Sequence, residues 1–143
     1  MSVEENKAIY RRFVEEIINQ GNYALVDELF AADYVDHNAP PGAPEGLEGV
    51  KAVFALFRTG FPDVHFTIDR MVGEGDKVAT WVTGHGTNNG PFLGTPPSGK
   101  EATWASTGIF RVANGKIVEH WGTPDLVGLL QQIGAIPAPA PAR

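Results

Sequence analysis

Cysteine is absent from the 143 residues, and no apolar run approaches the length of a membrane-spanning helix. The first absence excludes disulfides, thiol nucleophiles and cysteine-based zinc sites. Residues 1–12 also lack the apolar centre of a signal peptide. Together these features predict a cytoplasmic protein with no membrane segment.

Positive charge is scarce as well. The chain carries 11 Lys and Arg residues against 17 Asp and Glu residues, a formal net charge of -6, with no long basic run. Such a surface repels phosphate backbones and anionic lipids, so we expect neither nucleic acid nor a membrane as a partner. A glycine-rich phosphate loop and a nucleophile elbow are also missing.

The overall composition of the chain is typical of one globular domain. A chain of 143 residues with 43% hydrophobic and 20% charged residues is long and apolar enough to bury one core. We expect a single domain over residues 1–136, followed by a flexible Pro/Ala-rich tail over residues 137–143.

Three helical patterns occupy the first part of the chain. Ser2 begins a capping-box pattern, after which apolar residues recur at helical spacing until Gly21. Asn22 can cap a second, shorter helix that extends to Phe30, and a third apolar face covers residues 47–59.

The hydrophobic period changes to two from Val64 onward. This change predicts one strand up to the turn at residues 73–76, and a second strand over residues 77–85. A long hairpin is predicted over residues 101–125, followed by a final helix. Helices segregated from an antiparallel sheet indicate an α+β fold, whose concave sheet face can hold a pocket against the helices.

Two irregular segments are candidates for the edge of that pocket. Residues 33–38 read DYVDHN and precede a rigid Pro-Pro-Gly turn, which is typical of a cavity rim. Residues 88–100 contain three glycines and three prolines. Because plain connections are shorter, this second segment is either a lid or mouth of the pocket or an unusually long loop.

The register of the hairpin depends on its turn. A three-residue bulged turn pairs Phe110 with Val118, whereas a two-residue turn pairs Phe110 with Glu119. We favour the bulged turn because it groups two apolar residues. In this register one face of the hairpin can line the pocket, and the other face is apolar enough for sheet-to-sheet dimerisation. The predicted pocket face comprises Trp104, Ser106, Phe110 and His120, and the predicted outer face comprises Ile109, Arg111, Ile117, Glu119 and Trp121.

Several short segments follow one another along the chain. They are Phe61-Pro62-Asp63, Gly75-Asp76-Lys77-Val78, Gly94-Thr95-Pro96-Pro97-Ser98-Gly99-Lys100, Asn114-Gly115-Lys116-Ile117 and Glu119-His120-Trp121. In this order they resemble the SnoaL-like polyketide cyclases and ester cyclases of the nuclear-transport-factor-2-like superfamily. The resemblance implies a cone of three helices and a curved sheet, within a superfold that hosts cyclases, isomerases, lyases, hydrolases and non-enzymatic binders.

One position departs from the family pattern. The resemblance places the proton-shuttling aspartate of the founding cyclases directly after the Glu119-His120-Trp121 triplet, where this chain has Gly122. It places Asp36 where those cyclases have a pocket asparagine. The catalytic candidates therefore become His120, with Asp36 or His37.

These three candidates are chosen for their acid–base chemistry. Imidazole titrates near neutral pH, so His120 is the leading acid–base candidate, although a hydrogen-bonded structural histidine is the alternative. Asp36 and His37 are adjacent, and neighbours on an extended strand point to opposite faces. Only one of the two is expected to enter the pocket.

The predicted pocket is aromatic and takes a small hydrophobic or aromatic molecule with a carbonyl group. Ser106 or a tryptophan N–H is the candidate for stabilising an enolate oxygen. His85 either lines the pocket or is exposed, and Asp125 either contacts substrate or only complements the last helix. The predicted substrate-binding residues are Trp104, Trp81, Ser106, Tyr34, Phe92, His85 and Asp125.

We expect no cofactor and no metal, because the four histidines lack a recognised ligand spacing. The leading hypothesis is therefore cofactor-independent acid–base chemistry of the cyclase, isomerase, lyase or hydrolase type, in a homodimer formed through the outer sheet face. One alternative is a small-ligand-binding domain that has lost the catalytic aspartate. The other is a structural dimerisation module with a filled cone.

Overall fold

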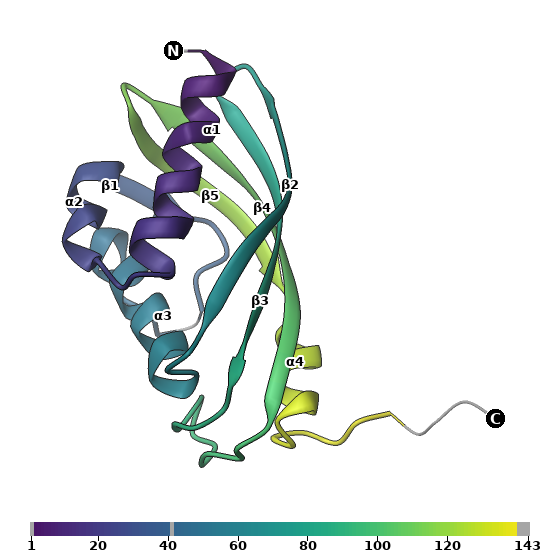
Figure 1. Cartoon of the computed structure of the whole chain (residues 1–143). Coiled ribbons are helices and arrows are strands. Elements are labelled where there is room, and N and C mark those ends of the chain that lie inside the picture. Colours follow the sequence, from purple (N-terminus) through teal and green to yellow (C-terminus); the bar gives the residue numbers. More distant parts are fainter. Residues whose placement is uncertain (1, 41, 140–143) are drawn as a thin grey trace.

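The computed structural model describes residues 2–40 and 42–139. The N-terminal helices pack against one face of a long, curved sheet (Figure 1). The first helix, α1 (Val3–Arg12), begins with the predicted capping box and continues as a π-helical segment, η1 (Phe13–Ile18). The wider π turn lets Phe13, Val14, Ile17 and Ile18 all face the interior, where each is buried.

The second predicted helix is shorter than expected. A 3-10 turn, η2 (Tyr23–Leu25), leads into α2 (Val26–Leu29), and the Asn22 side chain makes no capping hydrogen bond. Phe30 belongs to a strand, β1 (Phe30–Asp36), which the sequence analysis missed. Its partner is β5 (Lys116–Pro124), more than 80 residues away, and the local alternation of polar and apolar residues is irregular.

The remaining elements are close to prediction. They are α3 (Gly46–Gly60), β2 (His65–Glu74), β3 (Lys77–Thr87), β4 (Glu101–Ala113) and α4 (Leu126–Gln132). The strand order is β1-β5-β4-β3-β2, with β1 and β5 parallel and the other neighbours antiparallel. The result is the predicted cone-like α+β fold, with a mixed sheet that does not close into a barrel.

Both hairpin registers considered from the sequence are wrong for Phe110, which pairs with His120. The turn itself has two residues, since Ala113 pairs with Lys116, but the register then shifts by one along β5. Val118 is the extra residue of this β-bulge. The two-residue turn pairs Ile117 with the buried Val112, so Ile117 points inward and is fully buried, and its predicted place on the outer face is wrong.

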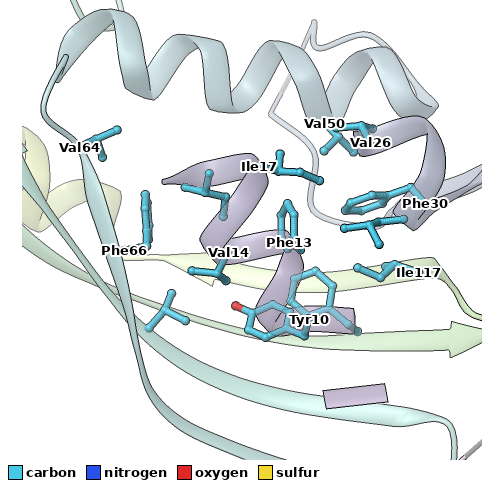
Figure 2. Packing of buried hydrophobic residues seen from close by; sticks show 14 of the residues in the cluster. Tyr10, Phe13, Val14, Ile17, Val26, Phe30, Val50, Val64, Phe66 and Ile117 are labelled. Carbon is cyan, nitrogen blue, oxygen red and sulfur yellow. The ribbon is translucent and has the colours of Figure 1, made fainter. Parts of the chain in front are cut away.

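The core lies between α1, η1, α3 and the concave face of the sheet. Figure 2 shows Phe13 and Ile17 of the first helix close to Phe30 of β1 and Ile117 of β5. The Phe13 ring meets the Phe30 ring edge-on, with centroids 5.1 Å apart. This aromatic packing fills the centre of the cone and leaves space toward the end of β1.

The irregular segment 88–100 packs at the C-terminal end of α3. Asn88 is fully buried, and its amide nitrogen donates to the carbonyls of Gly60 and Gly90. Phe92 is 1% exposed and contacts the ring of Phe57. The segment therefore closes the end of the cone below α3 instead of covering a pocket mouth.

The C-terminal helix α4 follows β5 after Asp125. Gln132 of this helix bonds both backbone groups of Thr103 on β4, with each N···O distance 2.8 Å. Of the predicted tail, residues 137–139 have no regular structure and residues 140–143 lie outside the described residues. Within the described part of the chain, no helix combines the length and apolar character needed to cross a membrane.

Candidate functional site

An inner cavity of about 110 Å³ lies between the helices and the concave face of the sheet. Most of its wall is apolar, and its polar groups come from four strands and α1. The lining residues are Tyr10, Phe13, Ile18, Phe30, Tyr34, Asp36, Gly49, Val50, Val53, Phe54, Phe66, Thr80, Val82, Ser106, Thr107, Gly108, Phe110 and His120.

Asp36 and His120 form an acid–histidine pair in this wall. The parallel register of β1 and β5 sets the two residues directly side by side, so both side chains point to the concave face. His120 Nδ1 lies 3.3 Å from Asp36 Oδ1, and the two side chains are 23% and 27% exposed. A histidine held through Nδ1 presents Nε2 to a ligand, as a general base requires.

The local contacts keep Asp36 ionised. Burial acts to raise the pKa of Asp36, but the hydrogen bond from His120 and the backbone N–H of Asn38 outweigh it and leave the pKa below its ordinary value. The Asn38 N–H donates to Asp36 Oδ1 at 3.0 Å. Asp36 is therefore a carboxylate at neutral pH and acts as an acceptor for His120.

Two buried tyrosines also line the cavity. Burial raises the pKa of Tyr10 to about 12. Burial, together with the nearby negative charge of Asp36, raises the pKa of Tyr34. Both phenols therefore remain protonated at neutral pH and can donate a hydrogen bond to a ligand oxygen. Thr80 and Ser106 add hydroxyl groups to the same wall.

A second cavity of about 260 Å³ adjoins the first between the end of β1 and the start of α3. Tyr34, Asp36 and Val50 line both cavities. Residues 43–46 bound this outer cavity, and Tyr34, Val35 and Asp36 of the segment predicted to form the rim also line it. We call this outer cavity the mouth.

His37 lies on the opposite face of the sheet from Asp36. Its Nε2 is 2.8 Å from Glu119 Oε2, and its ring stacks on Trp121 with centroids 4.7 Å apart. Glu119 also accepts a hydrogen bond from Arg111. As the alternation predicts, only one residue of the Asp36-His37 pair enters the cavity, and that residue is Asp36.

The structure divides the predicted substrate-binding residues into three groups. Ser106 and Tyr34 line the inner cavity. Trp104 is 2% exposed and lies deeper in the core, with its ring stacked on Phe57 at 5.8 Å. Phe92 also packs against the Phe57 ring. Trp104 and Phe92 therefore belong to the core next to the cavity and are not among the residues that line it.

Trp81, His85 and Asp125 lie away from the cavity. Trp81 is 49% exposed on the outer sheet face, and His85 is exposed on the same face, where its ring lies 6.0 Å from that of His65. The Asp125 carboxylate caps α4 by accepting the N–H of Gly128 at 2.9 Å. Within residues 2–40 and 42–139, no group of three or more metal-binding side chains is placed to hold an ion.

The sequence analysis missed two features of the site. Tyr10 and Phe54 line the cavity although their helical spacing indicates only core packing. Asn38 was grouped with a loop, but its side chain accepts the N–H of Gly122 at 2.9 Å and so extends the β1–β5 pairing beyond β1. The polar run at residues 33–38 was the available signal for Asn38.

Relatives of known activity match most of this chain. It is 25% identical over 124 residues to nogalonic acid methyl ester cyclase of Streptomyces nogalater, covering 81% of this chain and 88% of that protein. It is 27% identical over 136 residues to aklanonic acid methyl ester cyclase DnrD of Streptomyces peucetius, covering 93% of this chain and 92% of that one.

A solved structure gives the same result for the fold. TsrD from Streptomyces laurentii superposes with a TM-score of 0.86 at 29% identity, covering 95% of this chain and 99% of that one. The family described as SnoaL-like polyketide cyclase matches residues 8–133, which is most of the sequence. The chain therefore belongs to the SnoaL-like polyketide cyclase family.

Proposed function

We propose that this protein is a cofactor-independent cyclase that uses the Asp36–His120 pair for proton transfer on a neutral, carbonyl-bearing small molecule. The observation that carries the proposal is the placement of this pair in the wall of an otherwise apolar cavity. Family membership and the two methyl ester cyclases support a cyclisation in particular.

In the proposed reaction, Asp36 accepts a hydrogen bond from the Nδ1–H of His120, which keeps the proton on Nδ1 and leaves Nε2 unprotonated. Nε2 then removes a proton from the carbon beside a substrate carbonyl, and the C–H electron pair forms an enolate. A hydroxyl of the cavity wall, from Tyr34, Tyr10 or Ser106, donates to the enolate oxygen. The enolate carbon attacks a second carbonyl, and the imidazolium returns its proton to the new alkoxide, so the closed ring is an isomer of the substrate.

The size of the site suggests how the substrate lies. Pockets for drug-sized ligands usually measure about 300–1,000 Å³, which exceeds the inner cavity alone. The inner cavity therefore takes the reacting end, and the remainder of the molecule extends through the mouth.

The charge of the site favours a neutral ligand. Asp36 and Glu45 contribute carboxylates, and the described residues that line the two cavities include neither Lys nor Arg. An ionised carboxylic acid is disfavoured in such a site, whereas an ester or ketone is not.

Turnover of nogalonic and aklanonic acid methyl esters, followed by chromatography of the cyclised product, tests the proposal. His120→Ala is expected to lower kcat/KM by roughly 100- to 10,000-fold, the usual contribution of a general base. His85→Ala is the matched control, because this histidine lies on the exposed outer face, and it should retain wild-type turnover. Equal turnover in the His120 variant would refute the proposed base.

The same assay separates the enzyme from the alternative, a ligand-binding domain without activity. Tight binding of both esters by wild-type protein, with no product after prolonged incubation, would support the binding domain. Measurable cyclisation that depends on Asp36 and His120 would exclude it.

We also propose a homodimer formed through the outer face of the sheet. Trp81, Ile109 and Val72 are exposed there, with exposed fractions of 49%, 42% and 65%. Sedimentation analysis should give a dimer for the wild type and a monomer for Trp81→Glu, because a charge at a buried interface is strongly unfavourable. A dimer that persists in the variant at micromolar concentration would contradict this interface.

A further inference from the structure

The imidazole of His120 lies over two glycines. Gly108 and Gly122 pair across β4 and β5, and neither carries a side chain beneath the ring. A Cβ built on Gly122 would lie 2.6 Å from His120 Cε1 and closer still to Nε2, while one on Gly108 would lie 3.0 Å from Nε2. The ring therefore occupies the space that a side chain at position 122 needs.

The ring is also held from two other directions. The Phe110 ring stacks on it, with centroids 4.3 Å apart and an interplanar angle of 21°. Asp36 holds Nδ1 from the neighbouring strand. His120 therefore lies in a space bounded by Gly108 and Gly122, by the Phe110 ring and by the Asp36 carboxylate. We call this space the slot.

Backbone conformation does not explain the glycine at position 122. Gly122 is not among the residues with a left-handed backbone, so other residue types can adopt its conformation. Apart from the His120 ring, the nearest atom to a Cβ at this position is the carbonyl oxygen of Thr107 at 3.4 Å, an ordinary contact. Among the nearest atoms of the described residues, those of His120 are therefore the ones that a Cβ here would displace.

We propose that Gly122 is a positioning residue, which creates the slot that holds His120 against Asp36. This inference rests on the proposed function only where it names His120 as the base. It explains why the chain keeps an acid–base pair although the position that resembles the family's aspartate is glycine. In this chain the carboxylate that contacts the imidazole comes from Asp36 of β1, and the imidazole fills the space beside Gly122.

Gly122→Ala tests the slot without reference to turnover. The added methyl group must push the imidazole away, which breaks the Asp36 hydrogen bond. The ¹⁵N shifts of the His120 ring should change, and the Asp36 carboxyl, followed by ¹³C detection, should titrate at a higher pH than in the wild type. The Asn38 N–H and Tyr34, which also adjoin Asp36, and His37, whose charge acts on Asp36 from the opposite face of the sheet, remain in place, so the change reports on His120 alone. An unchanged Asp36 titration would overturn the proposal.

Gly73→Ala is the matched control. Gly73 is also a strand glycine, and its Cβ would meet a side-chain atom, Val3 Cγ1, at 2.5 Å, but it lies on β2 away from the cavity. This variant should leave the His120 and Asp36 signals unchanged. If it alters them as much as Gly122→Ala does, the effect is general strain and the slot is refuted.

A double variant separates the slot from a simple folding requirement. In a His120→Ala background the methyl group at position 122 meets no ring, so the double variant should fold like the single His120→Ala variant. With a methyl ester probe, Gly122→Ala alone should lower turnover about 100-fold or more and add nothing in the His120→Ala background. Independent losses would overturn the inference. Absence of turnover in the wild type would instead refute the proposed function and leave the NMR test of the slot intact.

Discussion

Two acid–histidine pairs lie back to back on β1 and β5, and they provide a matched comparison. Asp36 and His120 face the cavity, whereas Glu119 and His37 pair on the outer face. Asp36→Asn and Glu119→Gln each remove one carboxylate charge and keep the shape of the side chain. If the cavity is the site of chemistry, the two substitutions should affect activity very differently.

The structure sets the size of the stability change for Asp36→Asn. The carboxylate accepts from His120 and from the Asn38 N–H, and hydrogen bonds to charged groups contribute about 1.5–3 kcal/mol. Partial exposure of the pair and the oxygen retained by the amide reduce the loss to about 1–2 kcal/mol. For a domain of this size, that corresponds to a fall in Tm of roughly 3–6 °C.

The pH dependence of this loss has a definite sign. The pKa of Asp36 in the folded protein is below its ordinary value, so the carboxylate stabilises the fold at pH values above its unfolded pKa of about 3.9. This contribution disappears as the pH falls through the lower pKa of the folded state. The stability difference between wild type and Asp36→Asn should therefore be complete at pH 6–7 and shrink below about pH 4 in urea titrations.

Turnover of the methyl esters completes the comparison. Asp36→Asn should lower kcat by roughly 100-fold or more, because the amide no longer stabilises the imidazolium that forms during proton transfer. Glu119→Gln should remain within about twofold of the wild type. A comparable loss in both variants would mean that the cavity pair has no special role, and the reasoning would fail.

Two further predictions concern the elements that frame the site. Asn88→Ala should lower the free energy of unfolding by roughly 2–4 kcal/mol in urea titrations, because it removes a buried amide that donates to the carbonyls of Gly60 and Gly90 and accepts the N–H of Ser98. A loss below about 0.5 kcal/mol would contradict that role. Gln132→Ala should cost only about 1 kcal/mol, since water can reach the freed backbone groups of Thr103. Hydrogen exchange at Thr103 should accelerate in this variant, and unchanged protection would contradict the contact.

Local patterns were sufficient for most of the fold. The capping box at Ser2, the apolar face of α3 and the change to a period of two at Val64 each depend on neighbouring residues, and each agrees with the structure. The family resemblance then placed these elements in a cone. The elements that packing determines were harder to predict, as β1 and the bulge at Val118 illustrate.

The bulge shows why the candidate site was only partly predictable. No turn rule places an extra residue at Val118, because the bulge reconciles a two-residue turn with the inward direction of both Ile117 and His120. The pairing of Asp36 with His120 likewise requires the parallel register between β1 and β5. Alternation alone correctly predicted that Asp36 and His37 separate, but not which of them would face inward.

The same dipeptide pattern, an acid followed by histidine, occurs at Asp36-His37 and again at Glu119-His120. The parallel register sets Asp36 beside His120 on the inner face, while Glu119, which lies beside Val35, reaches diagonally to His37 on the outer face. Sequence chemistry therefore does not distinguish the two pairs, and the difference comes from their surroundings. The outer pair lies on the exposed face beside Arg111, which neutralises its carboxylate. The inner pair faces apolar rings, and only there is a slot left open by Gly122. The glycine at the position of the family's aspartate is thus consistent with an active pair.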